Sequence, residues 1–203
     1  MLLGRYGLGQ DNGGQDCGGQ GSGQASEPSK GRRAWDEKDA VLITYADMVQ
    51  AVGVPPLEVL ERFLRERIGD AFNSIHILPF FPASSDDGFS VVHYRQVDPA
   101  LGAWKDVEAI ARNYRLMCDL VLNHVSRESC WFKDFCAGIA PARDYFITVP
   151  PGKDLSQVVR PRSHPLLTAF PTRGGVKQVW TTFSNDQVEL NFANPDVLFE
   201  LLD

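Results

Sequence analysis

The stretch from Leu116 to His124 reads LMCDLVLNH, and it decides how the fold is interpreted. A parallel strand that is covered on both faces is almost continuously apolar, so this run predicts a buried strand over residues 116–122. Asp119 interrupts the run, and Asn123 and His124 follow it directly. Polar groups in such a place need hydrogen-bond partners or a function. The stretch therefore predicts a buried strand whose carboxyl end carries functional residues.

Two similar strand signals precede this one, and helix signals separate them. Residues 40–45 (AVLITY) and 75–78 (IHIL) are short apolar runs, the second closed by a proline. Pro55 and Pro56 open a helix that Gly69 is placed to end, and Asp106 is placed to cap a second helix. The order β-α-β-α-β predicts parallel strands and an α/β fold.

Composition excludes several classes of protein. The 203 residues are 43% hydrophobic, which is ordinary for a soluble globular chain, and no run approaches the roughly 20 apolar residues of a membrane span. No signal peptide is apparent at the N-terminus, so we expect a cytoplasmic protein without membrane contact. A net charge of -6 argues against nucleic-acid binding. The four cysteines form no C-x-x-C pair, so we expect free thiols and no zinc site.

The chain changes character at both ends of the regular region. Residues 1–34 hold ten of the 18 glycines and predict a disordered Gly/Gln-rich tail. After His124 the regularity fails for about sixty residues, and a loop of that length is usually functional or a small subdomain. Asn194 and Pro195 then begin a helix, inside which the chain stops at Asp203.

Polar residues follow all three predicted strands. They are Tyr45 with Asp47, the loop 84–89 (SSDDGF), and Asn123 with His124. In α/β barrels this face carries the active site. The alternative to this hypothesis is that these residues have only structural roles. Asp86 and Asp87 would then be turn residues that cap backbone amides, and the histidine a core residue bonded to a carbonyl.

Aromatic residues occur near the same loops. Sugar rings have apolar faces and polar rims, so aromatic side chains beside Asp, His and Gln are typical of carbohydrate recognition. The aromatic residues concerned are Phe80, Phe81, Phe89, Trp104, Trp180 and Phe183. Core packing is the alternative for Phe80 and Trp104.

Two motifs carry a family resemblance. Asp119-x-x-x-Asn123-His124 resembles the first signature of the α-amylase superfamily, glycoside hydrolase family 13, and the stretch 187–191 (QVELN) is similar to a later signature. The stretches LITYAD, HILPFFPASSDDGFSVVHY and VWTTFSNDQVELNFANP are similar to the sucrose phosphorylase and glucosylglycerate phosphorylase branch. The resemblance covers residues 35–203.

The resemblance implies an architecture. It is the N-terminal portion of a (β/α)8 barrel, with about three strands and a small inserted subdomain after strand three. Residues 35–125 would be the first βα units, 126–186 the inserted subdomain and 187–203 a return helix in which the chain is truncated. Three of eight strands cannot close a barrel, so we expect exposed edges and possible self-association.

The resemblance also implies a reaction and site residues. A glucosyl unit from glucosylglycerate or sucrose would pass through a covalent intermediate to phosphate, with no metal or cofactor. The substrate-binding residues would be Asp86 and His124 at the sugar hydroxyls, Phe89 and Phe183 as aromatic walls, and Gln187 on the acceptor side. Asp119 and Asn123 would support the pocket.

No catalytic residue is assigned to this chain, because the nucleophile Asp and the acid/base Glu are expected beyond Asp203. His93 and Glu189 stand where relatives usually carry Asp. The chain alone is expected to be inactive. The alternatives are a hydrolase or transglucosidase of the same superfamily, and a non-catalytic remnant or sugar-binding fragment.

Overall fold

The computed structural model describes residues 36–159 and 162–202. The Gly/Gln-rich tail predicted at 1–34 lies outside these residues. The chain divides into two units, of which the first comprises 1–38 with 203 and the second 39–202. Every helix and strand below belongs to the second unit.

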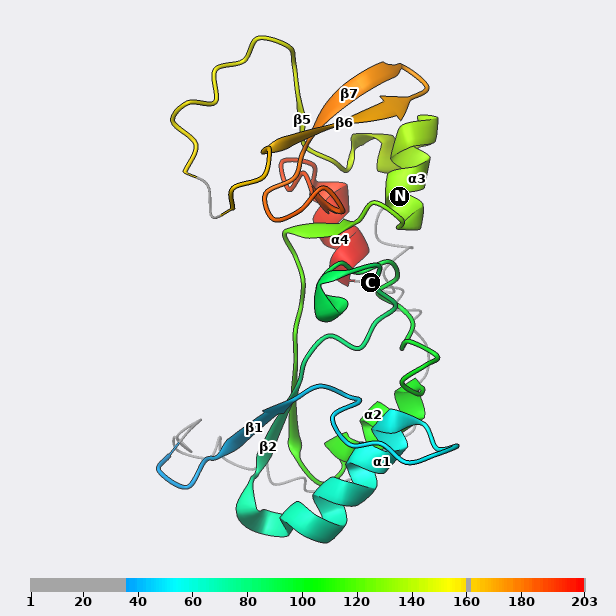
Figure 1. Cartoon of the computed structure of the whole chain (residues 1–203), viewed down its shortest axis with the longest axis vertical. Helices are drawn as coiled ribbons and strands as arrows, with labels where there is room; N and C mark the ends of the chain where they lie inside the picture. The colour runs from blue at the N-terminus through cyan, green and yellow to red at the C-terminus, as the bar shows by residue number, and fades with distance from the viewer. Residues whose placement is uncertain (1–35, 160–161, 203) are drawn as a thin grey trace, which may run out of the picture. The chain divides into compact units, whose positions relative to one another are not determined.

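A parallel sheet forms the first part of this unit. Its strands are β1 (Val41–Thr44), β2 (Ser74–Ile77) and β3 (Arg115–Cys118), in the spatial order β1-β2-β3. Figure 1 shows α1 (Pro56–Phe63) and α2 (Trp104–Ala111), which connect the successive strands. The predicted β-α-β-α-β order with parallel strands is confirmed.

Alternation along the strands gives the sheet two different faces. Ile75 and Ile77 of β2 are fully buried in one hydrophobic cluster with residues of both helices, including Leu57, Leu60, Val107 and Ile110. On the neighbouring strands, Ile43 and Met117 are 61% and 42% exposed. Successive side chains of a strand point to opposite faces, so the helices cover one face of this sheet.

The two helices differ in how well their ends were predicted. α1 begins at Pro56 and continues as a π-helical segment, η1 (Leu64–Ile68), which ends at Gly69 with φ 51°, as expected. A 3-10 turn, η2 (Gly69–Ala71), follows it. Asp106, predicted to cap the second helix, lies inside its first turn. The residue before the helix is Ala103, whose N–H is bound by the Asp106 carboxylate at 2.9 Å.

The third strand is shorter than predicted, and it is largely exposed instead of buried. It ends at Cys118 instead of residue 122, and the prediction over 119–122 was wrong. The ladder ends at the pair of Ile77 and Cys118, where β2 also ends, and Asp119 beyond it bonds Nε2 of His76 on β2 through its Oδ2 atom at 2.9 Å. His124 also does not end this strand. It begins β4 (His124–Ser126), which pairs antiparallel with β8 (Gln187–Glu189).

The residues between these two short strands share a hydrophobic core with β4 and β8. α3 (Cys130–Ala137) and the turn η4 (Ala142–Asp144) pack beside an antiparallel sheet of β5 (Thr148–Val149), β7 (Gly175–Trp180) and β6 (Leu167–Thr172). Phe132 lies at its centre, with ring distances of 5.3, 5.0 and 4.7 Å to Phe135, Phe146 and Phe170.

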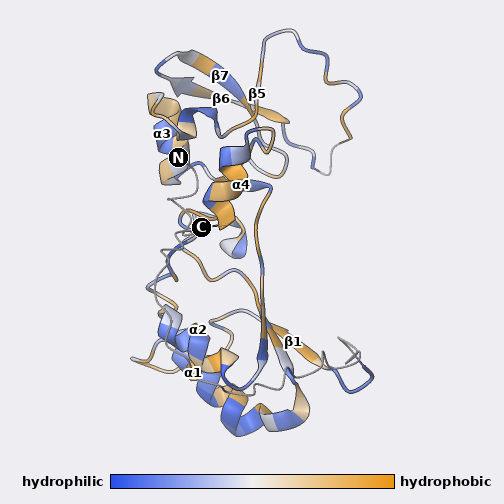
Figure 2. Cartoon of the chain, turned by 180° about the vertical axis from the view of Figure 1, so that it is seen from behind, coloured by the Kyte–Doolittle hydropathy of each residue, from blue (hydrophilic) through white to orange (hydrophobic). Residues whose placement is uncertain are grey.

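The last helix begins where it was predicted. α4 (Pro195–Leu202) follows Asn194, whose Oδ1 accepts the Asp196 N–H at 3.1 Å. The segment 187–203 is not helical throughout, because β8 precedes α4. Figure 2 shows that most of α4 is hydrophobic, and Leu198 and Leu202 are exposed on it.

Two predictions from composition concern the described residues. Within 36–159 and 162–202, no helix combines the length and apolar character that crossing a membrane requires. Cys118, Cys130 and Cys136 are free thiols, as expected, and Cys17 lies outside the described residues.

Candidate functional site

The loop after β2 has an unusual backbone. It contains the turn η3 (Asp86–Gly88), in which Asp86 and Asp87 have φ values of 58° and 48°. These left-handed conformations are uncommon for residues other than glycine. Gly88 has φ 99°, and a Cβ atom there would lie 2.7 Å from the carbonyl oxygen of Pro79. The loop therefore holds a strained shape that depends on a glycine and on contacts outside itself.

Asp86 is joined to the β4–β8 pair by a side-chain hydrogen bond. Nε2 of Gln187 donates to Oδ2 of Asp86 at 2.8 Å. Gln187 is only 2% exposed, whereas Asp86 is exposed. The buried amide thus fixes one carboxylate oxygen, and the rest of the carboxylate faces solvent.

His124 lies between the two aromatic residues of the predicted site. Its Nε2 atom lies 3.1 Å from the carbonyl oxygen of Phe89, and its ring centroid lies 5.1 Å from that of Phe183. His124 is 6% exposed. Burial lowers the pKa of His124, although the Phe89 carbonyl and the Asp86 charge oppose that shift. A neutral ring that donates from Nε2–H to the carbonyl fits this geometry.

The structure therefore brings together all five residues that were predicted to bind substrate. Gln187 contacts Asp86, and His124 contacts Phe89 and Phe183. The bond from His124 to a carbonyl also agrees with the alternative that this histidine is a core residue with a structural role. That alternative does not by itself account for the Phe183 ring and the Asp86 carboxylate close to His124.

The two predicted support residues act in different ways. Asp119 connects β3 to β2 through His76. The Asn123 residue is exposed, and its backbone carbonyl accepts the N–H of Leu190 at 2.9 Å. Asn123 thus anchors the segment after β8 through its main chain.

Asp186 is a central residue that the sequence reasoning missed. Its Oδ2 atom accepts the hydroxyls of Ser84, Ser85 and Ser90 at 2.5, 2.5 and 2.6 Å. Ser126 of β4 reaches the other oxygen at 3.4 Å. The signal available in the sequence was a serine-rich loop, SSDDGFS, together with an Asp directly before Gln187.

Two carboxyl groups beside the site have shifted pKa values. Burial acts to raise the pKa of Asp186, but the three serine hydroxyls and Arg127 outweigh it, so the pKa is lowered. Burial raises the pKa of Glu189, and hydrogen bonds from Thr182 oppose that rise. Glu189 lies opposite His124 in the β4–β8 ladder. Asp186 is thus held as an anion, whereas ionisation of Glu189 is disfavoured.

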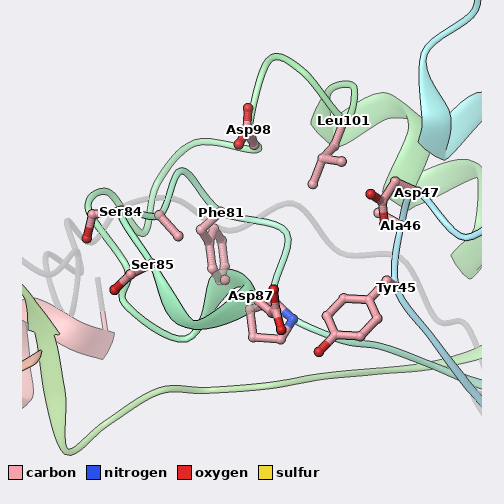
Figure 3. A pocket seen from close by; sticks show the side chains of 12 residues that line it. Tyr45, Ala46, Asp47, Phe81, Ser84, Ser85, Asp87, Asp98 and Leu101 are labelled. Atoms are coloured by element: carbon pink, nitrogen blue, oxygen red, sulfur yellow. The ribbon is translucent and has the colours of Figure 1, made fainter. Parts of the chain in front are cut away.

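A cavity of about 500 Å³ lies beside the loop after β2. Figure 3 shows that the loop after β1 and the loop after β2 line it together. Tyr45 and Asp47, which follow the first strand, therefore meet Asp87 of the second loop, as the common edge of a parallel sheet predicts. The five predicted substrate-binding residues are not in its lining, which consists of Tyr45, Ala46, Asp47, Pro79, Phe81, Ala83, Ser84, Ser85, Asp87, Gly88, Asp98 and Leu101.

These features define an α/β protein with a polar and aromatic site beyond the carboxyl ends of its parallel strands. The chain belongs to the alpha-amylase family, because residues 68–203 match the family described as alpha amylase, catalytic domain. The resemblance inferred from the motifs is therefore confirmed at the level of the family.

Individual relatives carry more specific names. The chain is 56% identical over 169 residues to a glucosylglycerate phosphorylase of Allomeiothermus silvanus. The aligned region covers 83% of this chain and 30% of that protein. It is 54% identical over 177 residues to a glucosylglycerate phosphorylase of Spirochaeta thermophila, and this alignment covers 87% of this chain and 30% of that protein. The chain thus spans about a third of the length of these relatives.

A solved structure supports the same fold. The crystal structure of sucrose 6F-phosphate phosphorylase from Thermoanaerobacter thermosaccharolyticum matches with a TM-score of 0.71 and 32% identity. The match covers 81% of this chain and 36% of that one.

Proposed function

We propose that this chain is the glucosyl-holding part of a retaining sugar phosphorylase. In this proposal β1–β3 and their helices are the first units of a (β/α)8 barrel, and residues 126–186 are a subdomain inserted after the third strand. The reaction transfers a glucosyl unit from an α-glucoside to phosphate and yields glucose 1-phosphate. Glucosylglycerate is preferred over sucrose as the donor, because the relatives with the higher identities are named glucosylglycerate phosphorylases.

The convergence of Asp86, Phe89, His124, Phe183 and Gln187 carries this proposal. The family motifs selected these residues, which lie up to 101 positions apart in the sequence, and the contacts described above join them. An exposed carboxylate, a buried amide and aromatic rings together suit a sugar, whose hydroxyls need polar partners and whose ring faces are apolar.

Each side chain has a distinct proposed role. Asp86 accepts hydrogen bonds from glucosyl hydroxyls, because part of its carboxylate is free of Gln187. Phe89 and Phe183 contact the apolar faces of the ring, and His124 sets their separation through the Phe89 carbonyl. Asp119 and Asn123 hold the adjoining backbone.

Retaining transfer also needs two further carboxyl groups. One forms a glucosyl ester as the bond from the anomeric carbon to the donor oxygen breaks, and the other gives that oxygen its proton. Phosphate then attacks the anomeric carbon, releases the ester and gives up its proton to the acid/base group. We assign neither group to a residue of this chain, and we propose that the 203-residue chain has no turnover by itself.

The binding part of the proposal is tested on the purified 203-residue chain. Calorimetric titration with glucose should give a saturable signal that His124→Ala and Asp86→Asn weaken, and that Asp196→Asn, an exposed carboxylate on α4, leaves unchanged. A flat titration from folded protein would remove the glucosyl-holding role. Formation of glucose 1-phosphate by this chain would overturn the claim of inactivity.

The reaction itself is tested on the complete product of the gene, whose intact mass is measured first. Glucosylglycerate and sucrose are each supplied with and without phosphate. A phosphorylase releases glucose 1-phosphate only with phosphate. Release of free glucose at a rate independent of phosphate would indicate the alternative, a hydrolase or transglucosidase of the same family.

A further inference from the structure

One carboxylate from outside the strained loop after β2, that of Asp186, accepts three hydroxyl hydrogen bonds from the loop. We propose that Asp186 is a positioning residue that fixes this loop, and with it Asp86 and Phe89, through the hydroxyls of Ser84, Ser85 and Ser90. This role deepens the proposed function. Only the expected effect on sugar binding rests on the proposed function. The attachment of the loop is a separate claim.

Three hydrogen bonds from the loop converge on a single atom. Three serine hydroxyls, all from the loop, donate to Oδ2 of Asp186 at 2.5–2.6 Å, over sequence separations of 96 to 102 residues. Short bonds from hydroxyl to carboxylate are typical of the stronger, charge-assisted class. Ser90 is fully buried, and Ser84 Oγ at 3.1 Å is the other side-chain partner of its hydroxyl.

The loop's other hydrogen bonds do not replace this attachment. Ser84 N–H bonds the Ser90 carbonyl at 3.0 Å, and Phe89 N–H bonds the Asp86 carbonyl at 2.9 Å. These bonds close the loop on itself. Its other links to distant segments are bonds with Gln187, His124 and Ser126, whereas Asp186 alone binds three of its side chains. Asp86 and Asp87 are left-handed, a conformation that persists only when surrounding contacts impose it.

Asp186 itself is anchored independently of the loop. Its carbonyl oxygen accepts the Arg127 N–H at 2.8 Å, and its own N–H donates to Ser184 Oγ at 3.3 Å. The Arg127 guanidinium Nε lies 3.6 Å from Oδ1. The β4–β8 pair therefore presents the carboxylate as a fixed acceptor next to Gln187, and the loop attaches to it.

This arrangement explains how Asp86 meets Gln187. Because Asp186 and Gln187 are adjacent, the residue that receives the loop and the residue that binds Asp86 share one stretch of backbone. Without the attachment, only the bonds from Gln187, His124 and Ser126 would hold the strained turn to distant segments. We therefore expect loss of Asp186 to disorder the sugar-facing loop without unfolding the parallel sheet.

The test compares the chain with Asp186→Ala, Asp186→Asn and Ser85→Ala. Asp154→Asn is the matched control, because Asp154 is an exposed carboxylate whose serine partner, the N–H of Ser156, is local in sequence. Hydrogen–deuterium exchange is followed in residues 84–92 and, as an internal reference, in β2. The expected result is exchange at least about tenfold faster in 84–92 for Asp186→Ala, with β2 and the control unchanged.

The two milder variants keep the test decisive if Asp186→Ala does not fold. Asp186→Asn retains an acceptor oxygen and Ser85→Ala removes one exposed donor, so both should give intermediate acceleration confined to the loop. Unchanged exchange in 84–92 in these variants would overturn the inference. Acceleration of equal size in β2 would also overturn it, because the carboxylate would then stabilise the whole fold.

Glucose titration of the same proteins separates this inference from the proposed function. Weaker glucose binding in Asp186→Ala, with partial recovery in Asp186→Asn, supports both. Absence of glucose binding by the wild-type chain refutes the proposed function and leaves the loop attachment supported by exchange. Equal glucose affinity with a loosened loop refutes the positioning role.

Discussion

Replacing Gln187 by glutamate should convert the link between Gln187 and Asp86 into a pH-dependent repulsion. The change adds a carboxyl group of almost the same shape at a buried position, where the native amide donates to Asp86 at 2.8 Å. Two carboxylates at that separation cannot both ionise without cost, so one of them takes up a proton. The difference in stability between the variant and the wild type should therefore depend on pH.

The geometry and the chemistry bound the size of this effect. Two unit charges 2.8 Å apart repel by about 6 kcal/mol at an effective dielectric constant of 20, and the exposure of Asp86 reduces this to roughly 2–3 kcal/mol. Desolvation of the introduced carboxylate adds to it. Protonation sets the upper limit, because holding a glutamic acid neutral at pH 7 costs about 3.5 kcal/mol. We expect a loss of about 2–3.5 kcal/mol at pH 7.

The sign of the pH dependence follows from the raised pKa of the introduced carboxyl. The penalty is absent below its unfolded pKa of about 4.3 and grows by up to about 1.4 kcal/mol per pH unit above it. Urea unfolding of Gln187→Glu, Gln187→Met and wild type, followed by Trp fluorescence at pH 5, 6 and 7, measures this difference. Gln187→Met loses the hydrogen bond without adding charge, so its deficit should not vary with pH. A Gln187→Glu deficit that is the same at all three pH values would refute the reasoning.

Three further predictions concern the core, the loop and a buried carboxyl. Phe132→Ala should lower the free energy of unfolding by about 3–5 kcal/mol, because three aromatic rings lose their contact, and Phe132→Leu should cost less in the same urea titration. Gly88→Ala should destabilise by at least about 1 kcal/mol more than Gly53→Ala, since both have positive φ but only the first places a Cβ against Pro79; equal losses would contradict this. Burial raises the pKa of Glu189, so wild-type stability should fall as pH rises from about 4.5, and Glu189→Gln should remove that slope in thermal melts from pH 4 to 8.

The sequence by itself determined the local elements and the type of site. The apolar runs 40–45 and 75–78 predicted the strands that the structure has at 41–44 and 74–77. Pro56, Gly69 and Asn194 marked helix ends where the backbone has them. These signals are local, because capping, proline geometry and the need to bury apolar side chains act over a few residues. The motifs likewise selected five residues that the fold brings together, with Phe89 bound through its backbone carbonyl.

Only the tertiary structure decided where those elements stop and what holds them. β3 ends at Cys118, opposite the last residue of β2, and Asp119 beyond it bonds His76, which lies 43 residues away in sequence. Asp186 receives a loop about a hundred residues away, and no local pattern records which serines will donate to it. Hydrogen bonds between distant segments depend on how the strands and loops meet in space, so the geometry of the site is a property of the folded chain.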